Sequence, residues 1–406
     1  MLARRIRWAA LAIAAAALTG CATHVNGSPV PGEIDVRTLD VGNYATSPLE
    51  VRYHMYRSVD NTTVLAEMRL DGAVVTGPEI DPRLTYGLGY KAFSDPDDGT
   101  GVLHMPGATT ALKDDGLMFG LSTSAAESNP DDPGSHLSDG AVAKVVVMQF
   151  PDEAAATKAA ADLEAADFAI AAAANQAVVL PKYPTAHAHW RPGIATIGSY
   201  VAHGDYVINA VAGVKDVDLG QLTGLVQQIF DAQLPLLDAL KPLDREAILR
   251  LKDDPDDMLR QTLNIDGMGI PDFESQFASS TRGFLHHVTD EKYWRNLLGA
   301  NGVDSYSQSG FSSSGITMLF RARDAHAAAQ LSAVALQPAF PGAAEAPPQV
   351  PEATCGEGKT VDDYSKKRYR CAVHYGRYVA LVESDQLTDV HQRAAAQYAL
   401  MANSTW

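Results

Sequence analysis

The sequence predicts an α+β fold of two similar domains, each a mostly antiparallel sheet with helices packed on one face. One observation is an internal repeat: "VVVMQFPDEAAATKAA", from Val145, resembles "TMLFRARDAHAAAQLS", from Thr317, at an offset of 172 residues. At the same offset "AHGDYVINAV", from Ala202, matches "HYGRYVALVE", from His374. Strand-like runs beside helices are typical of α+β sandwiches, and glycine turns between the runs predict antiparallel hairpins. The alternative is that alanine-rich helices and hairpins resemble one another generically.

Each copy begins with an apolar β-run, over residues 142–150 in the first copy and 315–321 in the second. Both runs stop at an aspartate, Asp152 or Asp324, and aspartate caps helices by accepting a backbone hydrogen bond. The alanine-rich stretches that follow predict two helices, at residues 152–174 and 324–335.

Two β-runs around a glycine turn come next, in "GSYVAHGDYVINAVAG" (198–213) and "YRCAVHYGRYVALVES" (369–384). Tyr, Val, Ile and Leu recur there as strand residues. Each copy closes with an amphipathic helix, at 219–240 and 387–401. In the first of these helices apolar residues recur at steps of three and four: Leu222, Leu225, Val226, Ile229 and Phe230.

A further helix and strand precede each copy, in "ATTALKDDGLMFGLSTS" (108–124) and "TDEKYWRNLLGANGVDSYSQSG" (289–310). Residues 241–273 predict a helix followed by an irregular crossing. We place the domain boundary near residue 241. The predicted domains are therefore residues 46–241 and 242–406.

The N-terminus predicts export and a lipid anchor. Three arginines precede an apolar run from Trp8 to Leu18, about eleven residues, which is too short to cross a bilayer as a helix. We therefore interpret residues 1–20 as a signal peptide. The run ends in Leu18-Thr19-Gly20-Cys21, which resembles the lipobox of bacterial lipoproteins. That resemblance implies a lipidated Cys21, with residues 21–45 as tether and the membrane as a partner.

The post-lipobox stretch "VNGSPVPGEIDVRTLDVGNY" resembles a family of actinobacterial lipoproteins of unknown function with tandem α+β halves. The likeness covers nearly the whole chain, and it implies an exported protein on the outer face of the cell membrane. It brings no known activity and no functional residues. Each half is also similar in element order to the extracellular sensor domains of mycobacterial Ser/Thr kinases.

The charge of the chain excludes nucleic acid as a partner. The 406 residues carry a net charge of −17, and removal of residues 1–20 leaves 29 basic against 49 acidic residues, a net charge of −20. Such a surface repels phosphate backbones and anionic headgroups, so membrane association should depend on the lipid.

Two cysteines remain outside the predicted anchor, Cys355 and Cys371, and disulfides persist outside the bilayer. We predict that they pair. At the 172-residue offset they overlie Tyr183 and Ser199, so the first copy builds the same region without a crosslink. The loop "QPAFPGAAEAPPQVPEATCGEGKT" has little to bury and is the segment that a tether would restrain. Two buried free thiols are the alternative.

Four histidines are candidate site residues. His187 and His189 are two apart, so an extended segment would point both imidazoles the same way toward a metal or ligand, although no third ligand is evident. The alternative is a loop with two solvent histidines beside Trp190. His286 and His287 precede a helix start at Thr289 or Asp290, and adjacent histidines face apart on a regular element.

The serine-rich and acidic segments give weaker evidence of a functional site. "GFSSSG" (310–315) lacks the Gly-x-Ser-x-Gly spacing of a nucleophile elbow and reads as a flexible connection into a strand at Gly315. The acidic segments 94–101 and 129–140 do not follow the twelve-residue calcium loop, so we interpret them as solvated turns.

These observations predict a lipid-anchored envelope protein that acts as a non-catalytic binding, sensing or scaffold module without a cofactor. The partner would be an unknown lipid, glycolipid or envelope protein; an apolar groove would favour lipid and a shallow polar cleft a protein. The alternative is an envelope hydrolase that uses His187 or His287 as general base.

Overall fold

The computed structural model describes residues 34–48, 57–129, 131–267, 271–337, 339–358 and 367–404. The chain divides into two compact units, Met1–Asp35 and Val36–Trp406, and each is considered by itself. All helices and strands below belong to the second unit. The predicted signal peptide and Cys21 lie outside the described residues.

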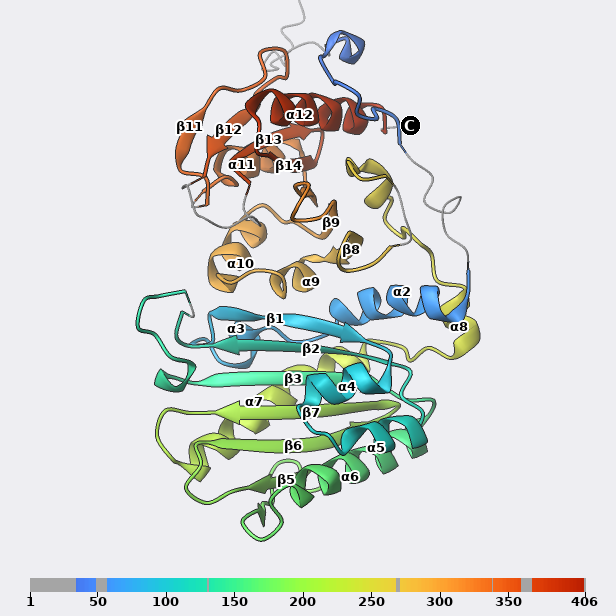
Figure 1. The fold of residues 1–406 in the computed structure, drawn as a ribbon, viewed down its shortest axis with the longest axis vertical. Coiled ribbons are helices and arrows are strands. Elements are labelled where there is room, and N and C mark those ends of the chain that lie inside the picture. Colours follow the sequence, from blue (N-terminus) through green and yellow to red (C-terminus); the bar gives the residue numbers. More distant parts are fainter. Residues whose placement is uncertain are drawn as a thin grey trace, which may run out of the picture. The chain divides into compact units, whose positions relative to one another are not determined.

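The first sheet has seven strands in the order β1-β2-β3-β7-β6-β5-β4, and every neighbouring pair is antiparallel (Figure 1). Its strands are β1 (Tyr86–Phe93), β2 (Phe119–Ala126), β3 (Val142–Gln149), β4 (Gln176–Ala177), β5 (His187–Trp190), β6 (Thr196–His203) and β7 (Tyr206–Gly213). The helices of this part are α2 (Val59–Asp71), α3 (Gly77–Ile80), α4 (Pro96–Leu103), α5 (Ala108–Asp114), η3 (Leu137–Asp139), α6 (Glu153–Ala169) and α7 (Leu219–Asp238). The short helix η1 (Val36–Thr38) precedes them in the chain and contacts the last helix of the second part, α12 (Leu387–Ala402).

The second sheet also has seven antiparallel strands, in the order β11-β12-β13-β14-β10-β9-β8. Its strands are β8 (Gln276–Ser280), β9 (Ser305–Ser309), β10 (Thr317–Arg321), β11 (Gly342–Ala344), β12 (Thr354–Glu357), β13 (Tyr369–Tyr375) and β14 (Tyr378–Ser384). The helices are α8 (Arg245–Leu249), η4 (Leu259–Gln261), α9 (Thr281–Leu285), α10 (Glu291–Ala300), α11 (Ala325–Val334) and α12 (Leu387–Ala402).

The two sheets are copies of one topology. Read from β8, the second order becomes β8-β9-β10-β14-β13-β12-β11, which matches the first strand for strand. Two helices stand between the first two strands of each copy, α4 and α5 or α9 and α10. The predicted fold class, α+β with two similar antiparallel sheets, is confirmed.

The repeat extends to single residues at the predicted offset of 172. Asp152 Oδ1 accepts the Ala155 backbone N–H at 2.8 Å, and Asp324 Oδ1 accepts the Ala327 backbone N–H at 2.8 Å. Gly204 and Gly376 both have φ of +53° in the turns of their hairpins, a conformation that favours glycine. Equivalent local chemistry therefore starts the same helix and closes the same hairpin in both copies.

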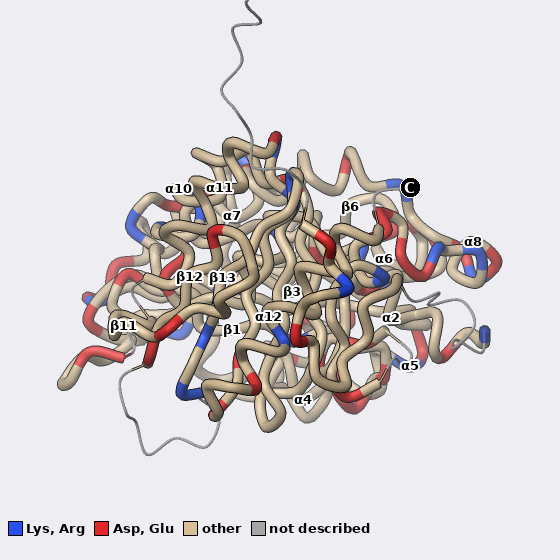
Figure 2. Tube along the Cα trace, turned by 90° about the horizontal axis from the view of Figure 1, so that it is seen from above, with Lys and Arg blue, Asp and Glu red and all other residues tan. Residues whose placement is uncertain are grey.

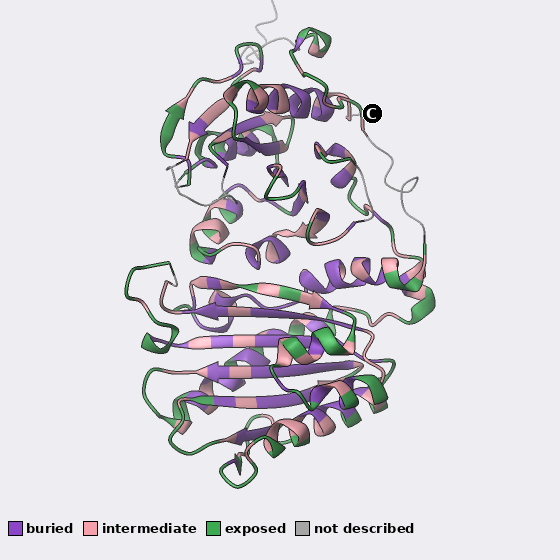
Figure 3. Cartoon of the chain, in the orientation of Figure 1, coloured by how far each residue is buried: buried purple, intermediate pink, exposed green. Residues whose placement is uncertain are grey.

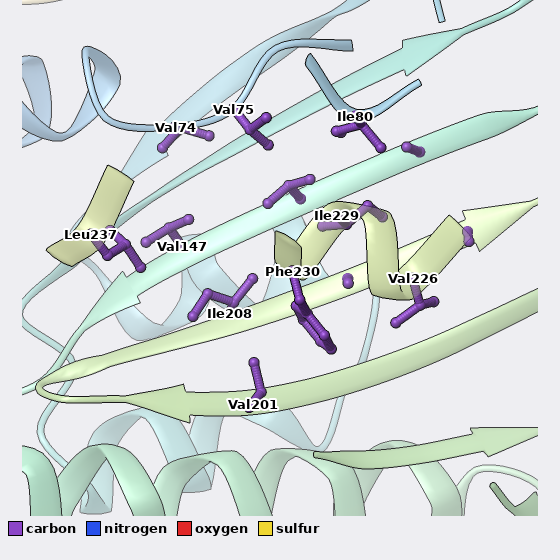
Figure 4. Packing of buried hydrophobic residues seen from close by; sticks show 14 of the residues in the cluster. Val74, Val75, Ile80, Val147, Val201, Ile208, Val226, Ile229, Phe230 and Leu237 are labelled. Carbon is purple, nitrogen blue, oxygen red and sulfur yellow. The ribbon is translucent and has the colours of Figure 1, made fainter. Parts of the chain in front are cut away.

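Helices cover both faces of the first sheet, in contrast to the single covered face that we predicted. Side chains of β3 alternate: Val145 and Val147 join the cluster that contains α7, whereas Val146 and Met148 join the one that contains α6. In Figure 4, Val226 and Phe230 of α7 lie over the strands. A run of consecutive apolar residues, such as 145–148 of β3, is typical of a sheet buried on both sides.

Helix α2 contributes to two hydrophobic clusters. Its Ala66 and Leu70 belong to the cluster of the first sheet, and its Leu65 and Met68 belong to that of the second, with Phe277 and Phe320. Figure 3 shows most of α2 as buried or half-buried. The helix therefore ties both sheets into one compact unit.

A buried glutamine in the last helix of each copy binds the backbone at the end of another helix, just after α2 or at the end of η4. Gln233 of α7 donates to the Ala73 carbonyl at 2.8 Å and accepts the Val75 N–H at 2.9 Å. Gln397 of α12 donates to the Gln261 carbonyl at 2.9 Å and accepts the Leu263 N–H at 2.7 Å. Each amide satisfies two backbone groups two residues apart, in the manner of a strand partner.

Cys355 and Cys371 form a disulfide between the directly opposed strands β12 and β13. Their register differs from the simple offset, because Ser199, the counterpart of Cys371, pairs with Ala188 and not with Tyr183. The paired residues are 16 positions apart in the second copy, five more than the separation of Ala188 and Ser199. The extra residues lie in the loop between β12 and β13, so a uniform offset misplaces Cys355.

The structure corrects the predictions for residues 94–101 and for the helix predicted at 152–174. Residues 94–101, which we interpreted as a solvated turn, contain the start of α4, where Asp95 accepts the Asp97 backbone N–H at 2.7 Å and Pro96 occupies the first turn. The helix predicted to reach residue 174 ends at Ala169 and is followed by turns. For α4, Pro96 is the signal that outweighed the loop-like composition, because proline favours the first position of a helix.

Candidate functional site

A polar cluster is buried where the C-terminal end of α2 meets β8, α9 and β2. Ser279 Oγ donates to Asp71 Oδ2 at 2.7 Å. His286 shares a hydrogen bond with Thr123 through Nδ1 at 3.1 Å, and its Nε2 lies 3.8 Å from Asp71 Oδ1. The side chains of Asp71 and His286 are fully buried. We call these four residues the Asp71 cluster.

The Asp71 cluster depends on a glycine. A Cβ on Gly283 would lie 1.8 Å from Ser279 Oγ and 2.1 Å from Asp71 Oδ2. Any side chain at that position would displace the carboxyl group. Glycine therefore makes the room that a buried carboxyl and its serine donor require.

Burial shifts both titratable groups of the Asp71 cluster toward their neutral forms. Burial raises the pKa of Asp71 to about 7, although the hydrogen bond from Ser279 lowers it. Burial also lowers the pKa of His286 to about 4. At neutral pH the imidazole is uncharged, so no cation balances the carboxylate, and Asp71 Oδ1 accepts no hydrogen bond among the described residues.

The Asp71 cluster does not assemble a nucleophile and its base. A catalytic serine is hydrogen-bonded to an imidazole that takes its proton, and a carboxylate orients that imidazole from the far side. Here Ser279 donates to the carboxylate, and the His286 nitrogen nearest Asp71 lies beyond hydrogen-bond distance. The arrangement suits a buried protonation site.

An apolar pocket of about 520 Å³ adjoins the Asp71 cluster; we call it the α2 pocket. Its walls come from α2, the segment after α8, β8 and β9. The apolar lining residues are Leu65, Met68, Leu251, Pro255 and Ala278. The polar lining residues include Ser279, Ser280 and Ser305, and the charged ones are Arg69, Arg250, Lys252, Asp253 and Asp256.

The charged groups of the α2 pocket leave an excess of positive charge. Asp253 pairs with Arg57 at 2.6 Å, and Asp256 lies 3.6 Å from Arg321. Arg69 hydrogen-bonds the Tyr206 hydroxyl, and no carboxylate in the described part of the chain forms an ion pair with Arg69 or Lys252. Two cations therefore remain available at the pocket, although acidic side chains are frequent elsewhere on the chain (Figure 2).

The two copies have diverged at the strand that borders the α2 pocket. Leu121 of β2 pairs with Val147, and Ser307 of β9 pairs with Leu319, which follows Val147 by 172 residues. Leu121 belongs to the cluster of the first sheet, in which α3 and the residues after it contribute Ile80 and Leu84. The counterpart face in the second copy carries the serines Ser305, Ser307 and Ser309. Of these serines, Ser305 lines the α2 pocket, whereas Ser307 Oγ lies 2.6 Å from Thr262 Oγ1.

A second cavity, of about 430 Å³, is lined by residues 87–90 of β1 and by residues 286–289. His287 is stacked on Phe277 at 4.6 Å and lies 3.9 Å from the Tyr90 ring, measured between ring centroids. Burial lowers the pKa of His287 to about 3, so it is neutral at any physiological pH. Ser279 lines the α2 pocket and His286 lines this second cavity, so the Asp71 cluster contributes one residue to each cavity.

The structure places the predicted histidine pair on β5. His187 is exposed, whereas His189 is largely buried, with Nδ1 3.0 Å from Glu164 Oε1 and its ring against Phe168. Within the described ranges no group of three His, Cys, Asp or Glu residues has the proximity that a metal site needs. A shared ligand for His187 and His189 stays a prediction.

The serine-rich segment 310–315 forms a turn between β9 and β10. Gly310 and Gly315 have φ of +97° and +101°, and Ser314 Oγ donates to Asp266 Oδ2 at 2.5 Å. The following strand begins at Thr317, two residues later than predicted.

Among the helices that the structure describes, none combines the length and apolar character needed to span a bilayer.

Sequence reasoning missed Asp71 and Ser279. They are 208 positions apart, and Thr123 and His286 are 163 positions apart, so no short sequence motif could predict the Asp71 cluster. The adjacent histidines "HH" were the one visible signal, and they indicated neither the carboxylate nor the serine.

Comparison with solved structures finds similarity to the extracellular domain of PknH from Mycobacterium tuberculosis, with 11% sequence identity and a TM-score of 0.26. The match covers 41% of this chain and 96% of that chain. A comparison with curated proteins found no match. Family models match two segments: residues 54–253 match "Domain of unknown function (DUF7373) N-terminal" and residues 258–404 match "Domain of unknown function (DUF7373) C-terminal". The two segments follow one another, span well over half of the 406 residues and contain both sheets, so the chain belongs to the DUF7373 family.

Proposed function

We propose that this chain is a lipid-anchored, non-catalytic binding module of the cell envelope that holds an amphiphile in the α2 pocket. The amphiphile would carry one acyl chain and an acidic head group. The observation that carries the proposal is the α2 pocket itself: apolar walls beside two cations that pair with no described carboxylate. Ligand sites typically combine such walls with a few polar groups that fix orientation.

Each part of the amphiphile has a counterpart in the α2 pocket. Transfer of an acyl chain from water stabilises the complex by about 0.8 kcal/mol per buried methylene group. Leu65, Met68 and Ala278 would cover that chain. An acidic head group would receive charge-assisted hydrogen bonds from Arg69 and Lys252, which are stronger than neutral ones. The non-catalytic part of the proposal is supported by Ser279, which donates to a carboxylate and not to an imidazole.

Calorimetric titration with dodecanesulfonate, kept below its micellar concentration, tests the proposal. The wild-type protein should bind one molecule. Ala278→Trp should fill the pocket and weaken binding at least tenfold, because Ala278 lines it. Ala343→Trp is the matched control, since Ala343 is an exposed alanine on β11, an edge strand of the same sheet. Equal affinity in the two tryptophan variants, both folded by circular dichroism, would contradict the proposed site.

The lipid anchor is tested separately. Cys21→Ala removes the thiol that the lipobox-like sequence presents for lipidation. We expect the variant to move from the membrane fraction to the soluble fraction of the host, and mass spectrometry should find the lipid on the wild-type N-terminal peptide alone. Full membrane association of the variant would contradict the anchor and leave the pocket proposal standing.

A further inference from the structure

We infer that the α2 pocket is proton-linked: its amphiphile binds more tightly when Asp71 carries a proton. The inference rests on the proposed function and adds a regulation of the same site. It begins with the position of Ser279, which both lines the α2 pocket and donates to Asp71. One hydroxyl thus faces the occupant on one side and the buried carboxyl on the other.

The hydroxyl of Ser279 has one proton to donate. In the empty pocket that proton goes to Asp71 Oδ2. An acidic head group in the pocket is a competing acceptor for the same proton. If Ser279 turns to the head group, the Asp71 carboxylate loses its side-chain donor, because Oδ1 has none among the described residues. A buried charge without a donor is strongly disfavoured, so the occupied state favours the protonated carboxyl.

The groups around Asp71 do not replace that donor. From α9, His286 presents Nε2 at 3.8 Å, and burial lowers its pKa to about 4, so it stays neutral. From β1, Tyr90 interacts electrostatically with Asp71, and burial together with the Asp71 charge raises the pKa of Tyr90. From β2, Thr123 is occupied with His286.

The nearest charged pair is already engaged. Arg282 of α9 binds Glu79 at 3.2 Å and donates to the Gly72 carbonyl at 2.9 Å. It therefore offers Asp71 no hydrogen bond. Protonation is the available response of Asp71 when Ser279 leaves, and this makes proton uptake and binding reciprocal.

The test is the affinity for dodecanesulfonate between pH 6 and pH 9, since the sulfonate stays ionised throughout. The affinity of the wild-type protein should fall as pH rises above about 7, with a limit of about tenfold per pH unit for one linked proton. Asp71→Asn mimics the protonated carboxyl and should bind with the same affinity at every pH. Asp216→Asn is the matched control, because Asp216 is an exposed acidic residue that does not line the pocket, and it should keep the wild-type pH dependence.

A second measurement needs no variant. The ¹³C resonance of the Asp71 carboxyl, followed with pH in labelled wild-type protein, should report a higher pKa with dodecanesulfonate bound than without it. Binding with the same pH dependence in wild type and Asp71→Asn, or an unchanged carboxyl titration, overturns the proton linkage but leaves the proposed function intact. Absence of binding at every pH overturns the proposed function and this inference with it.

Discussion

Asp71 shows how a single polar residue is tolerated in the interior. Its carboxyl group is fully buried, and the hydrogen bond from Ser279 offsets part of the cost of burial. Space for the pair is supplied by the missing Cβ of Gly283. A residue of this kind is maintained at a cost to stability, which is why we connect it with binding.

The cost should depend on pH in a defined direction. Burial raises the folded-state pKa of Asp71 to about 7, whereas an unfolded aspartate titrates near 3.8. Between these values the folded protein holds a proton that the unfolded chain has lost, so stability falls as pH rises through this range. The Asp71→Asn variant has no carboxyl group at this position, so it does not lose this stability as pH rises. Its free energy of unfolding relative to wild type should therefore increase between pH 5 and pH 8, by on the order of 2 kcal/mol.

Urea denaturation at both pH values measures this difference. Glu67 and Glu291, whose pKa values burial also raises, are present in both proteins and cancel in the comparison. Asp216→Asn again serves as control, because Asp216 is an exposed residue. A difference between wild type and Asp71→Asn that is the same at pH 5 and pH 8 would show that Asp71 has an ordinary pKa.

At the scale of elements, α7 and α12 do more than cover a sheet. Each directs one glutamine amide at the backbone of the segment that leads toward the first strand of its copy. The apolar periodicity of these helices predicts their buried faces but not this contact, since glutamine is normally a surface residue. Gln233 and Gln397 are fully buried all the same.

Gln233→Leu and Gln397→Leu should each lower the free energy of unfolding by about 2–3 kcal/mol, because each leaves a backbone N–H and a carbonyl buried without a partner. Gln228→Leu is the control, since Gln228 is an exposed residue of α7. Thermal denaturation of the three variants measures these differences in stability. If Gln397→Leu is as stable as Gln228→Leu, the amide contributes packing alone.

At the scale of the whole molecule, the sequence predicts those parts whose signal is local. The hairpins β6–β7 and β13–β14 and the helices capped by Asp152 and Asp324 are visible because their strand residues, turns and caps are neighbours in the chain. Strand β1 is not visible: it contains Gly87 and Gly89 around a bulge, and glycine is depleted in strands.

The candidate site could not be predicted for a different reason. The Asp71 cluster and the α2 pocket draw on segments near residues 70, 123, 253, 280 and 305, which meet when both sheets are complete. One difference between the copies leaves a trace in the sequence: Ser305 and Ser307 of "SYSQS" stand where the first copy has Phe119 and Leu121.

The two-sided helix α2 has a consequence for how the chain is made. A ribosome adds roughly 5–20 residues per second, from the N-terminus onward. Leu65 and Met68 are synthesised about 250 residues before Phe320, a member of the cluster that finally covers them. The growing polypeptide therefore displays this apolar stripe for roughly ten seconds or more at that rate. Products that terminate after the first sheet would display it permanently, which makes shortened chains natural clients of holding chaperones.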